Sequence, residues 1–201
     1  EYLRSVSPIY QDKLIVGGSL RRVDVASEGS LPDTSILIAI SSSFSEALRL
    51  IILLNDCCNS IDVPVIIRSH PTIPIKDLFS SFDWPNNIYL SEGNTLIEDL
   101  LSVSLVAYSS STVSLEGMLY GRLPVFIDIG DIPDGDPILG KCPVKYTVNK
   151  KNNLADIINE YKLLDSKSCN EKSGLAISYA SNYLQKVDAF KLEKIIGKVL
   201  E

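Results

Sequence analysis

The sequence predicts an α/β fold, a Rossmann-like doubly wound sheet of six mostly parallel strands with helices on both faces. Short apolar segments, such as 35–40 and 104–108, alternate with segments of helical spacing. Strands that are apolar on both faces belong to parallel sheets covered by helices. The 201 residues, 45% hydrophobic and 22% charged, are enough for one substantial domain with its own core.

The strands are expected where β-rich apolar runs are bounded by turn residues. A first short strand, Leu14–Val16, ends at Gly17 and Gly18. The six strands of the sheet are then expected, in order, at Ser35–Ile40, Val63–Arg68, Ile88–Leu90, Ser104–Tyr108, Leu123–Ile129 and Val144–Val148.

Helices are expected between these strands, each with a polar N-cap or a glycine stop where the chain offers one. The first follows Ser43 or Ser45 as its N-cap. The others are expected at Ile75–Phe82, at Thr95–Leu101 after Asn94 or Thr95, at Ser114–Tyr120 before Gly121, at Leu154–Leu164, and at Leu175–Leu200 as one helix or two with a break near Asp188.

Three segments are expected along the chain. Residues 1–24 form a linker with the first short strand, 25–174 form a nucleotide-sugar-binding domain, and 175–201 form a C-terminal helix that packs back on it. Because the chain begins at Glu1 and not at Met, we interpret it as a piece of a longer protein.

The net charge of −6 argues against a generic nucleic-acid binder, which needs a basic stripe. No segment approaches the roughly 20 apolar residues of a membrane span. Residues 150–201 hold nine Lys and seven acidic residues. They are expected to form a solvated helix face, with peripheral contact at the inner face of the membrane as the alternative. The four cysteines fit no metal or redox spacing, which predicts reduced thiols in a cytoplasmic protein.

Four strand ends carry unusual polar residues, and ligands of doubly wound sheets bind at the carboxyl ends of strands. These segments are Ser41–Ser45, Arg68–Thr72, Ser109–Thr112 and Asp128–Asp131. Small hydroxylated residues before a helix, as in Ser109–Thr112, suit a phosphate, because the helix N-terminus presents backbone N–H groups. The alternative is one N-cap within a tight turn.

His70 is the single histidine of the chain, and it precedes Pro71, which favours an extended backbone. At a strand end beside Arg68 it can donate a hydrogen bond to a phosphate or a leaving group. The alternative is a partly exposed turn histidine. It is a poor metal ligand, because no second histidine or suitably placed cysteine exists.

Two sets of carboxylates are candidates for a ligand role. Glu116, in the helix after the serine run, can accept two hydrogen bonds from ribose hydroxyls, or it can lie on a solvated helix face. Four aspartates suggest calcium but lack the twelve-residue loop and its terminal Glu, so we expect a mobile loop and no metal site; they are Asp128, Asp131, Asp134 and Asp136.

Three segments of the chain resemble parts of GT-B glycosyltransferases. The segment YSSSTVSLEGMLYGRLPVFI, 108–127, resembles their nucleotide-sugar-binding half. The segment LIVGGSLRRVD, 14–24, resembles the hinge before that domain in capsule and surface-polysaccharide transferases. The segment RSHPT, 68–72, resembles the His-Pro motif of bacterial polysialyltransferases, Kdo transferases and teichoic-acid polymerases.

The resemblance implies a role for each matching residue. His70 is the implied catalytic residue, which stabilises the departing phosphate together with the serines, and Glu116 holds the ribose. No metal is required, because fixed positive dipoles and side chains can stabilise the phosphate. No cofactor is implied either, since the nucleotide sugar is a substrate. The implied donor-binding set is Gly17, Ser19, Arg21, Ser42, Arg68, His70, Pro71, Ser109, Ser110, Ser111, Thr112 and Glu116.

The implied reaction transfers a sugar from a nucleotide sugar to a surface polysaccharide, such as capsule or O-antigen, or to a lipid-linked glycan. The motifs favour CMP-linked sialic acid or Kdo, while UDP-sugars and CDP-glycerol stay open. The N-terminal acceptor domain is missing, so we expect this piece to be inactive alone. One alternative is an enzyme similar to UDP-N-acetylglucosamine 2-epimerase, which would need more carboxylates and histidines. The other is a non-catalytic nucleotide-binding or interaction subunit of a split transferase.

Overall fold

The computed structural model describes residues 18–19, 32–130, 135–149 and 153–200. The predicted strand Leu14–Val16, together with Gly17 and Arg21, lies outside these residues.

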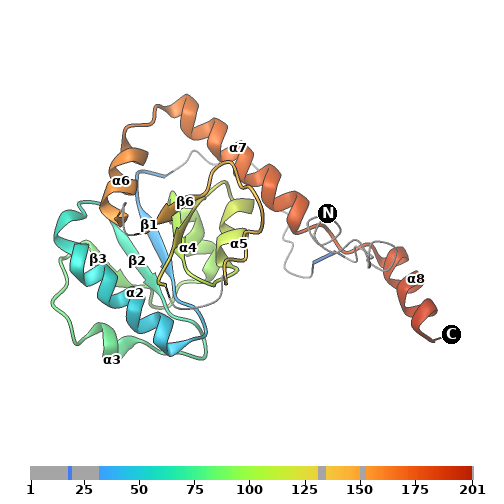
Figure 1. Cartoon of the computed structure of the whole chain (residues 1–201), viewed down its shortest axis with the longest axis horizontal. Helices are drawn as coiled ribbons and strands as arrows, with labels where there is room; N and C mark the ends of the chain where they lie inside the picture. Colours follow the sequence, from blue (N-terminus) through green and yellow to red (C-terminus); the bar gives the residue numbers. More distant parts are fainter. Residues whose placement is uncertain (1–17, 20–31, 131–134, 150–152, 201) are drawn as a thin grey trace.

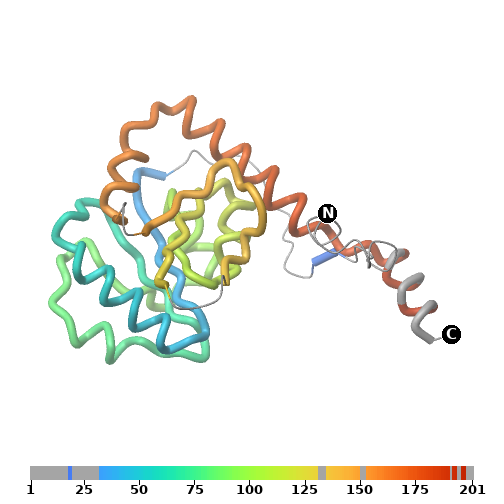
Figure 2. The backbone as a smooth tube through the Cα atoms, in the orientation of Figure 1, coloured from blue at the N-terminus to red at the C-terminus, as the bar shows by residue number. Residues whose placement is uncertain are grey.

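The centre of the molecule is one six-stranded sheet in which every pairing is parallel. The strand order is β3-β2-β1-β4-β5-β6. The chain therefore runs outward from β1 to β3 and then returns past β1 to build the other half, as the colours of Figure 2 show. The strands are β1 (Ile36–Ala39), β2 (Val65–Arg68), β3 (Ile88–Leu90), β4 (Leu105–Tyr108), β5 (Leu123–Ile127) and β6 (Tyr146–Val148). The predicted Rossmann-like fold class is confirmed.

Helices follow the strands and cover the sheet (Figure 1). Two start at the expected caps, because the Ser43 and Thr95 side chains accept hydrogen bonds from the third residue of α2 and α4. Asn153 caps α6 in the same way, and the sequence analysis named no cap for that helix. The helices are α2 (Phe44–Cys57), α3 (Lys76–Phe79), α4 (Leu96–Ser102), α5 (Val113–Leu119), α6 (Leu154–Lys162), α7 (Ser166–Tyr183) and α8 (Ala189–Leu200), with a 3₁₀ turn at Cys58–Ser60.

Both faces of the sheet are buried, as the continuous apolar strands predict. In β1, Ile36 and Ile38 belong to the larger core, whereas Leu37 belongs to a second cluster on the opposite face with Leu100 of α4 and Val106 of β4. Alternate residues of a strand point to opposite faces, so an all-apolar strand requires a hydrophobic layer on each side.

The helix predicted from Leu175 was wrong at its start. α7 begins nine residues earlier, at Ser166, with Asp165 as its N-cap. It packs against α5, and it buries Ala176 and Ala180. The chain breaks at 184–188 before α8, close to the expected position, and α8 lies away from the sheet (Figure 1). The boundary expected between residues 174 and 175 falls inside α7.

No helix among the described residues is long and apolar enough to span a membrane.

Candidate functional site

The strand order creates a switch point between β1 and β4. From β1 the chain proceeds to β2 on one side, and the second half of the sheet begins at β4 on the other. Because the loops leaving these two neighbouring strands diverge, a crevice opens at their carboxyl ends, which is the ligand position in doubly wound sheets.

A hollow of about 450 Å³ lies at this crevice, and we call it the central hollow. Residues that follow three different strands, far apart along the chain, meet around it. Seven of the predicted donor-site residues line it: Ser42 after β1, Arg68, His70 and Pro71 at the end of β2, and Ser110, Ser111 and Thr112 after β4.

The His70 ring is held in one orientation by Thr72. The Thr72 backbone N–H donates to Nδ1 at 3.2 Å, and the Thr72 hydroxyl lies 2.8 Å from the same nitrogen. A backbone N–H only donates, so Nδ1 is the acceptor, and we assign the proton of the neutral ring to Nε2. The Ile73 N–H also donates to the His70 carbonyl at 2.9 Å and closes the turn. His70 therefore has a donor, Nε2–H, available beside the central hollow.

Arg68 already has a carboxylate partner, which the sequence analysis did not identify. Its Nη1 lies 2.5 Å from Oδ2 of Asp99, a fully buried residue of α4. The same oxygen accepts a hydrogen bond from the Ser91 hydroxyl at 2.6 Å, and Oδ1 accepts one from the Asn94 amide at 3.0 Å. The network links β2, the end of β3 and α4, and it fixes the position of Arg68 at the rim of the hollow.

Glu46 is a second carboxylate that was missed. It lies in the first turn of α2, is 6% exposed, and its Oε2 accepts hydrogen bonds from the Ser41 and Ser110 hydroxyls, each at 2.6 Å. It thus joins the loop after β1 to the loop after β4 across the crevice. Ser43 and Glu46 have the spacing of a capping box, which predicts that the Glu46 carboxylate accepts from the Ser43 N–H at the helix start. In the structure the Ser43 N–H instead donates to the Ser41 hydroxyl at 3.3 Å.

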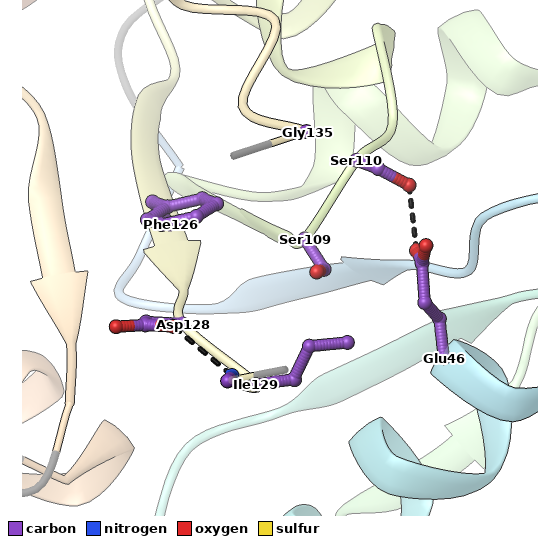
Figure 3. A pocket seen from close by; sticks show the side chains of 8 residues that line it. Glu46, Ser109, Ser110, Phe126, Asp128, Ile129 and Gly135 are labelled. Carbon is purple, nitrogen blue, oxygen red and sulfur yellow. Dashed lines mark hydrogen bonds between the residues drawn. The ribbon is translucent and has the colours of Figure 1, made fainter. Parts of the chain in front are cut away.

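A smaller hollow of about 260 Å³ lies on the other side of Ser110, and we call it the β4–β5 hollow (Figure 3). Ser109 lines this hollow and not the central one. Figure 3 shows Glu46 directed from α2 toward Ser110, whereas the Asp128 carboxylate points away from Glu46. The full lining is Glu46, Ser109, Ser110, Phe126, Asp128, Ile129, Gly130 and Gly135.

A third hollow of about 340 Å³ adjoins the central hollow on the side away from the β4–β5 hollow, and we call it the β2–β3 hollow. It shares Arg68, Ser69, His70 and Pro71 with the central hollow. Its remaining lining is partly apolar: Pro74, Ile75, Lys76, Leu90, Ser91 and Glu92. The three hollows therefore form a row along the carboxyl edge of the sheet.

The expectation of a mobile acidic loop was wrong at Asp136. This residue is 7% exposed and accepts hydrogen bonds from the Tyr108 hydroxyl at 2.9 Å and from the Ile138 N–H at 2.8 Å. Lys145 completes the cluster at 2.7 Å. Burial and the nearby Asp136 carboxylate raise the pKa of Tyr108, so the phenol stays protonated. Asp131 and Asp134 lie outside the described residues, and the described part of the chain holds no group of three His, Cys, Asp or Glu side chains arranged as metal ligands.

The remaining predicted residues do not line the central hollow. Glu116 is half-buried in the first turn of α5 and lines none of the three hollows. The Ser19 N–H donates to the Gln185 carbonyl at 2.7 Å, just after α7, and Ser19 lines none of the hollows either. Gly17 and Arg21 lie outside the described residues.

The fold is shared with solved glycosyltransferases. TarM matches with a TM-score of 0.57 and 14% identity over 88% of this chain and 37% of TarM. The spinosyn forosaminyltransferase SpnP matches with a TM-score of 0.54 and 18% sequence identity, and the match covers 89% of this chain and 50% of SpnP. The glycosyltransferase VinC, solved in complex with dTDP, matches with a TM-score of 0.50 and 14% sequence identity. That match covers 90% of this chain and 46% of VinC. No protein-family model and no curated protein matches the sequence.

These likenesses identify the class of fold. The chain has the architecture of one half of a GT-B glycosyltransferase, a Rossmann-like domain with the switch-point crevice at its carboxyl edge. It spans half or less of the length of the three structures just described.

Proposed function

We propose that this chain is the donor-binding domain of a metal-independent glycosyltransferase, and that it binds a nucleotide sugar at the switch point. One observation carries the proposal: seven residues predicted from three separate loops line a single hollow. The similarity in fold to glycosyltransferases, one of them solved with dTDP, supports the same ligand class.

The three hollows match the three parts of a nucleotide sugar in order. The phosphate suits the central hollow, where Arg68, the His70 Nε2–H and the hydroxyls of Ser111 and Thr112 lie. The β2–β3 hollow, with its prolines and Leu90, suits a flat nucleoside base. The β4–β5 hollow, lined by two serines and two carboxylates, suits a sugar. The phosphate lies between base and sugar in the ligand, as the central hollow lies between the other two.

The proposed chemistry is stabilisation of the leaving phosphate. When the bond between the sugar and the phosphate breaks, negative charge grows on the phosphate oxygen. A donor that is already oriented toward this oxygen stabilises the transition state more than the ground state. His70, which Thr72 holds with Nε2–H available, is the residue for this role. The acceptor would be a surface polysaccharide or lipid-linked glycan, and its site and the catalytic base would belong to a second domain.

Titration calorimetry with CMP, UDP, CDP and dTDP and their sugars tests the proposal. We expect at least one nucleotide to bind with a Kd below about 1 mM. His70→Ala should weaken that nucleotide about tenfold, because a hydrogen bond to a charged phosphate is lost, and His70→Gln, which keeps an N–H donor, should lose less.

The matched control is Glu160→Gln, which alters an exposed residue of α6. This variant should bind the nucleotide as tightly as the wild type does. If no nucleotide binds below about 1 mM and His70→Ala changes nothing, the chain is not a donor-binding domain. If a nucleotide binds but transfer begins only after an acceptor domain is added, the half-enzyme proposal is supported.

A further inference from the structure

Glu46 is a buried carboxylate whose observed partners are uncharged. Its Oε2 accepts hydrogen bonds from Ser41 and Ser110 at 2.6 Å each, and no cation lies within ion-pair distance of it among the described residues. Because its charge is not neutralised by an adjacent cation, its field acts on whatever occupies the β4–β5 hollow that it lines.

The same geometry sets the direction of the serine hydroxyls. Ser110 donates its hydroxyl proton to Glu46, so its oxygen presents lone pairs to a ligand and not a proton. It can accept a hydrogen bond from a sugar hydroxyl or an amine, but it cannot at the same time donate one to a phosphate or a carboxylate. Ser41 also donates its hydroxyl proton to Glu46, and its oxygen accepts the Ser43 N–H at 3.3 Å.

In the part of the chain that the structure describes, two cations lie near this hollow, and each has partners. The Arg49 Nη1 donates to the carbonyls of Ile129 and Gly130 at 3.3 and 3.1 Å, which holds it against the backbone of the rim. Lys145 lies 5.7 Å from the centre of the Phe126 ring, and its charge is matched by Asp136 at 2.7 Å. Neither side chain is among those that line the hollow, whereas the carboxylates of Glu46 and Asp128 are.

We propose that Glu46 is a specificity-determining residue, which restricts the β4–β5 hollow to an uncharged or cationic sugar and disfavours a sugar that carries a carboxylate. This inference rests on the proposed function and names its substrate class. Anionic sugars such as sialic acid and Kdo are thereby disfavoured as donors, although the His-Pro and serine motifs pointed toward them. A neutral hexose or an amino sugar fits the acceptor oxygens that Glu46 and Ser110 provide.

A matched pair of donors tests the proposal directly. UDP-glucose and UDP-glucuronic acid differ only at the sixth carbon, which is a hydroxymethyl group in one and a carboxylate in the other. The full chain is titrated with both, with UDP alone, and with CMP and CMP-sialic acid. We expect the wild type to bind UDP-glucose about tenfold more tightly than UDP-glucuronic acid, and CMP more tightly than CMP-sialic acid.

Glu46→Gln removes the charge but keeps an oxygen that can accept from Ser41 and Ser110. We expect it to reduce the preference for the neutral donor to about threefold or less. UDP alone has no sugar, so its affinity reports any general damage to the site. Glu160→Gln, exposed on α6, removes the same charge far from these loops and should keep the wild-type preference.

The outcomes separate the two proposals. If nucleotides bind but Glu46→Gln keeps the wild-type preference, the specificity role is wrong while the donor site stands. Tighter binding of UDP-glucuronic acid, or of CMP-sialic acid over CMP, also overturns it and would assign selection to Arg49. If no nucleotide binds at all, the proposed function fails, and the inference about Glu46 fails with it.

Discussion

Two buried carboxylates at the same edge of the sheet have very different surroundings. Asp99 is fully buried and meets the guanidinium of Arg68, with Ser91 and Asn94 completing its shell. Glu46 is almost as buried, but it meets two serine hydroxyls and lines a hollow. A carboxylate neutralised by a cation and saturated with donors stabilises the scaffold. One that has only hydroxyl partners and lies beside a cavity is available to a ligand.

Breaking the Asp99 network should give the largest effect on stability. Asp99→Ala leaves the Arg68 guanidinium without its carboxylate and removes three hydrogen bonds. Loss of one partner of a buried ion pair costs about 3–5 kcal/mol, and because Arg68 is partly exposed we expect about 3 kcal/mol in the free energy of unfolding. Urea denaturation measures this value.

The control for Asp99 is the exposed ion pair between Lys76 and Glu92, whose charged atoms are 3.0 Å apart. Glu92→Ala should change the free energy of unfolding by less than about 1 kcal/mol, because solvent screens the pair. If Asp99→Ala is no more destabilising than Glu92→Ala, the network does not hold β2, β3 and α4 together as argued.

Removing Glu46 should destabilise the protein less than removing Asp99. Glu46→Ala loses two charge-assisted hydrogen bonds, but the freed hydroxyls border hollows that water can enter, and no buried cation is left behind. We expect a loss of about 2 kcal/mol, and less for Glu46→Gln, which keeps an acceptor. The same urea titration measures both variants. An effect of Glu46→Ala equal to that of Asp99→Ala would place Glu46 in the scaffold and weaken its proposed role in selecting the donor.

The fold could be predicted from the sequence because its strands leave little ambiguity. Strands such as β1 and β4 are apolar on both faces, which only a covered parallel sheet satisfies. The start of α7 could not be predicted in the same way. Its first half, from Ser166 to Gly174, is polar, and the helix buries only two alanines, so it carries almost no periodic signal.

The site was predictable in part, for a related reason. Strand ends meet at one edge of a parallel sheet, so His70 and the serines could be placed together from the chain order alone. Asp99 and Glu46 lie inside amphipathic helices, where an acidic residue near the start looks like an ordinary helix-capping residue. Their partners, Arg68 and Ser110, are 31 and 64 residues away in the chain, and no local pattern indicates such pairings.

Asp165 is an exposed carboxylate, and its removal should change the stability of the protein less than the removal of Asp99 or Glu46. Asp165 is the N-cap of α7 and accepts hydrogen bonds from Ser168, which hold the pKa of Asp165 below its ordinary value of 3.8. Because the folded pKa is lowered, the stabilisation is present above pH 3.8 and is lost as the pH falls through the folded pKa. Asp165→Ala should therefore lower the Tm at neutral pH, and the difference from the wild type should shrink on the acid side of 3.8. Asp165→Asn keeps a good N-cap that does not titrate, so its Tm should follow a flatter course with pH. A constant difference between Asp165→Ala and the wild type across this range would show that the carboxylate charge contributes nothing at this helix start, in contrast to both buried carboxylates.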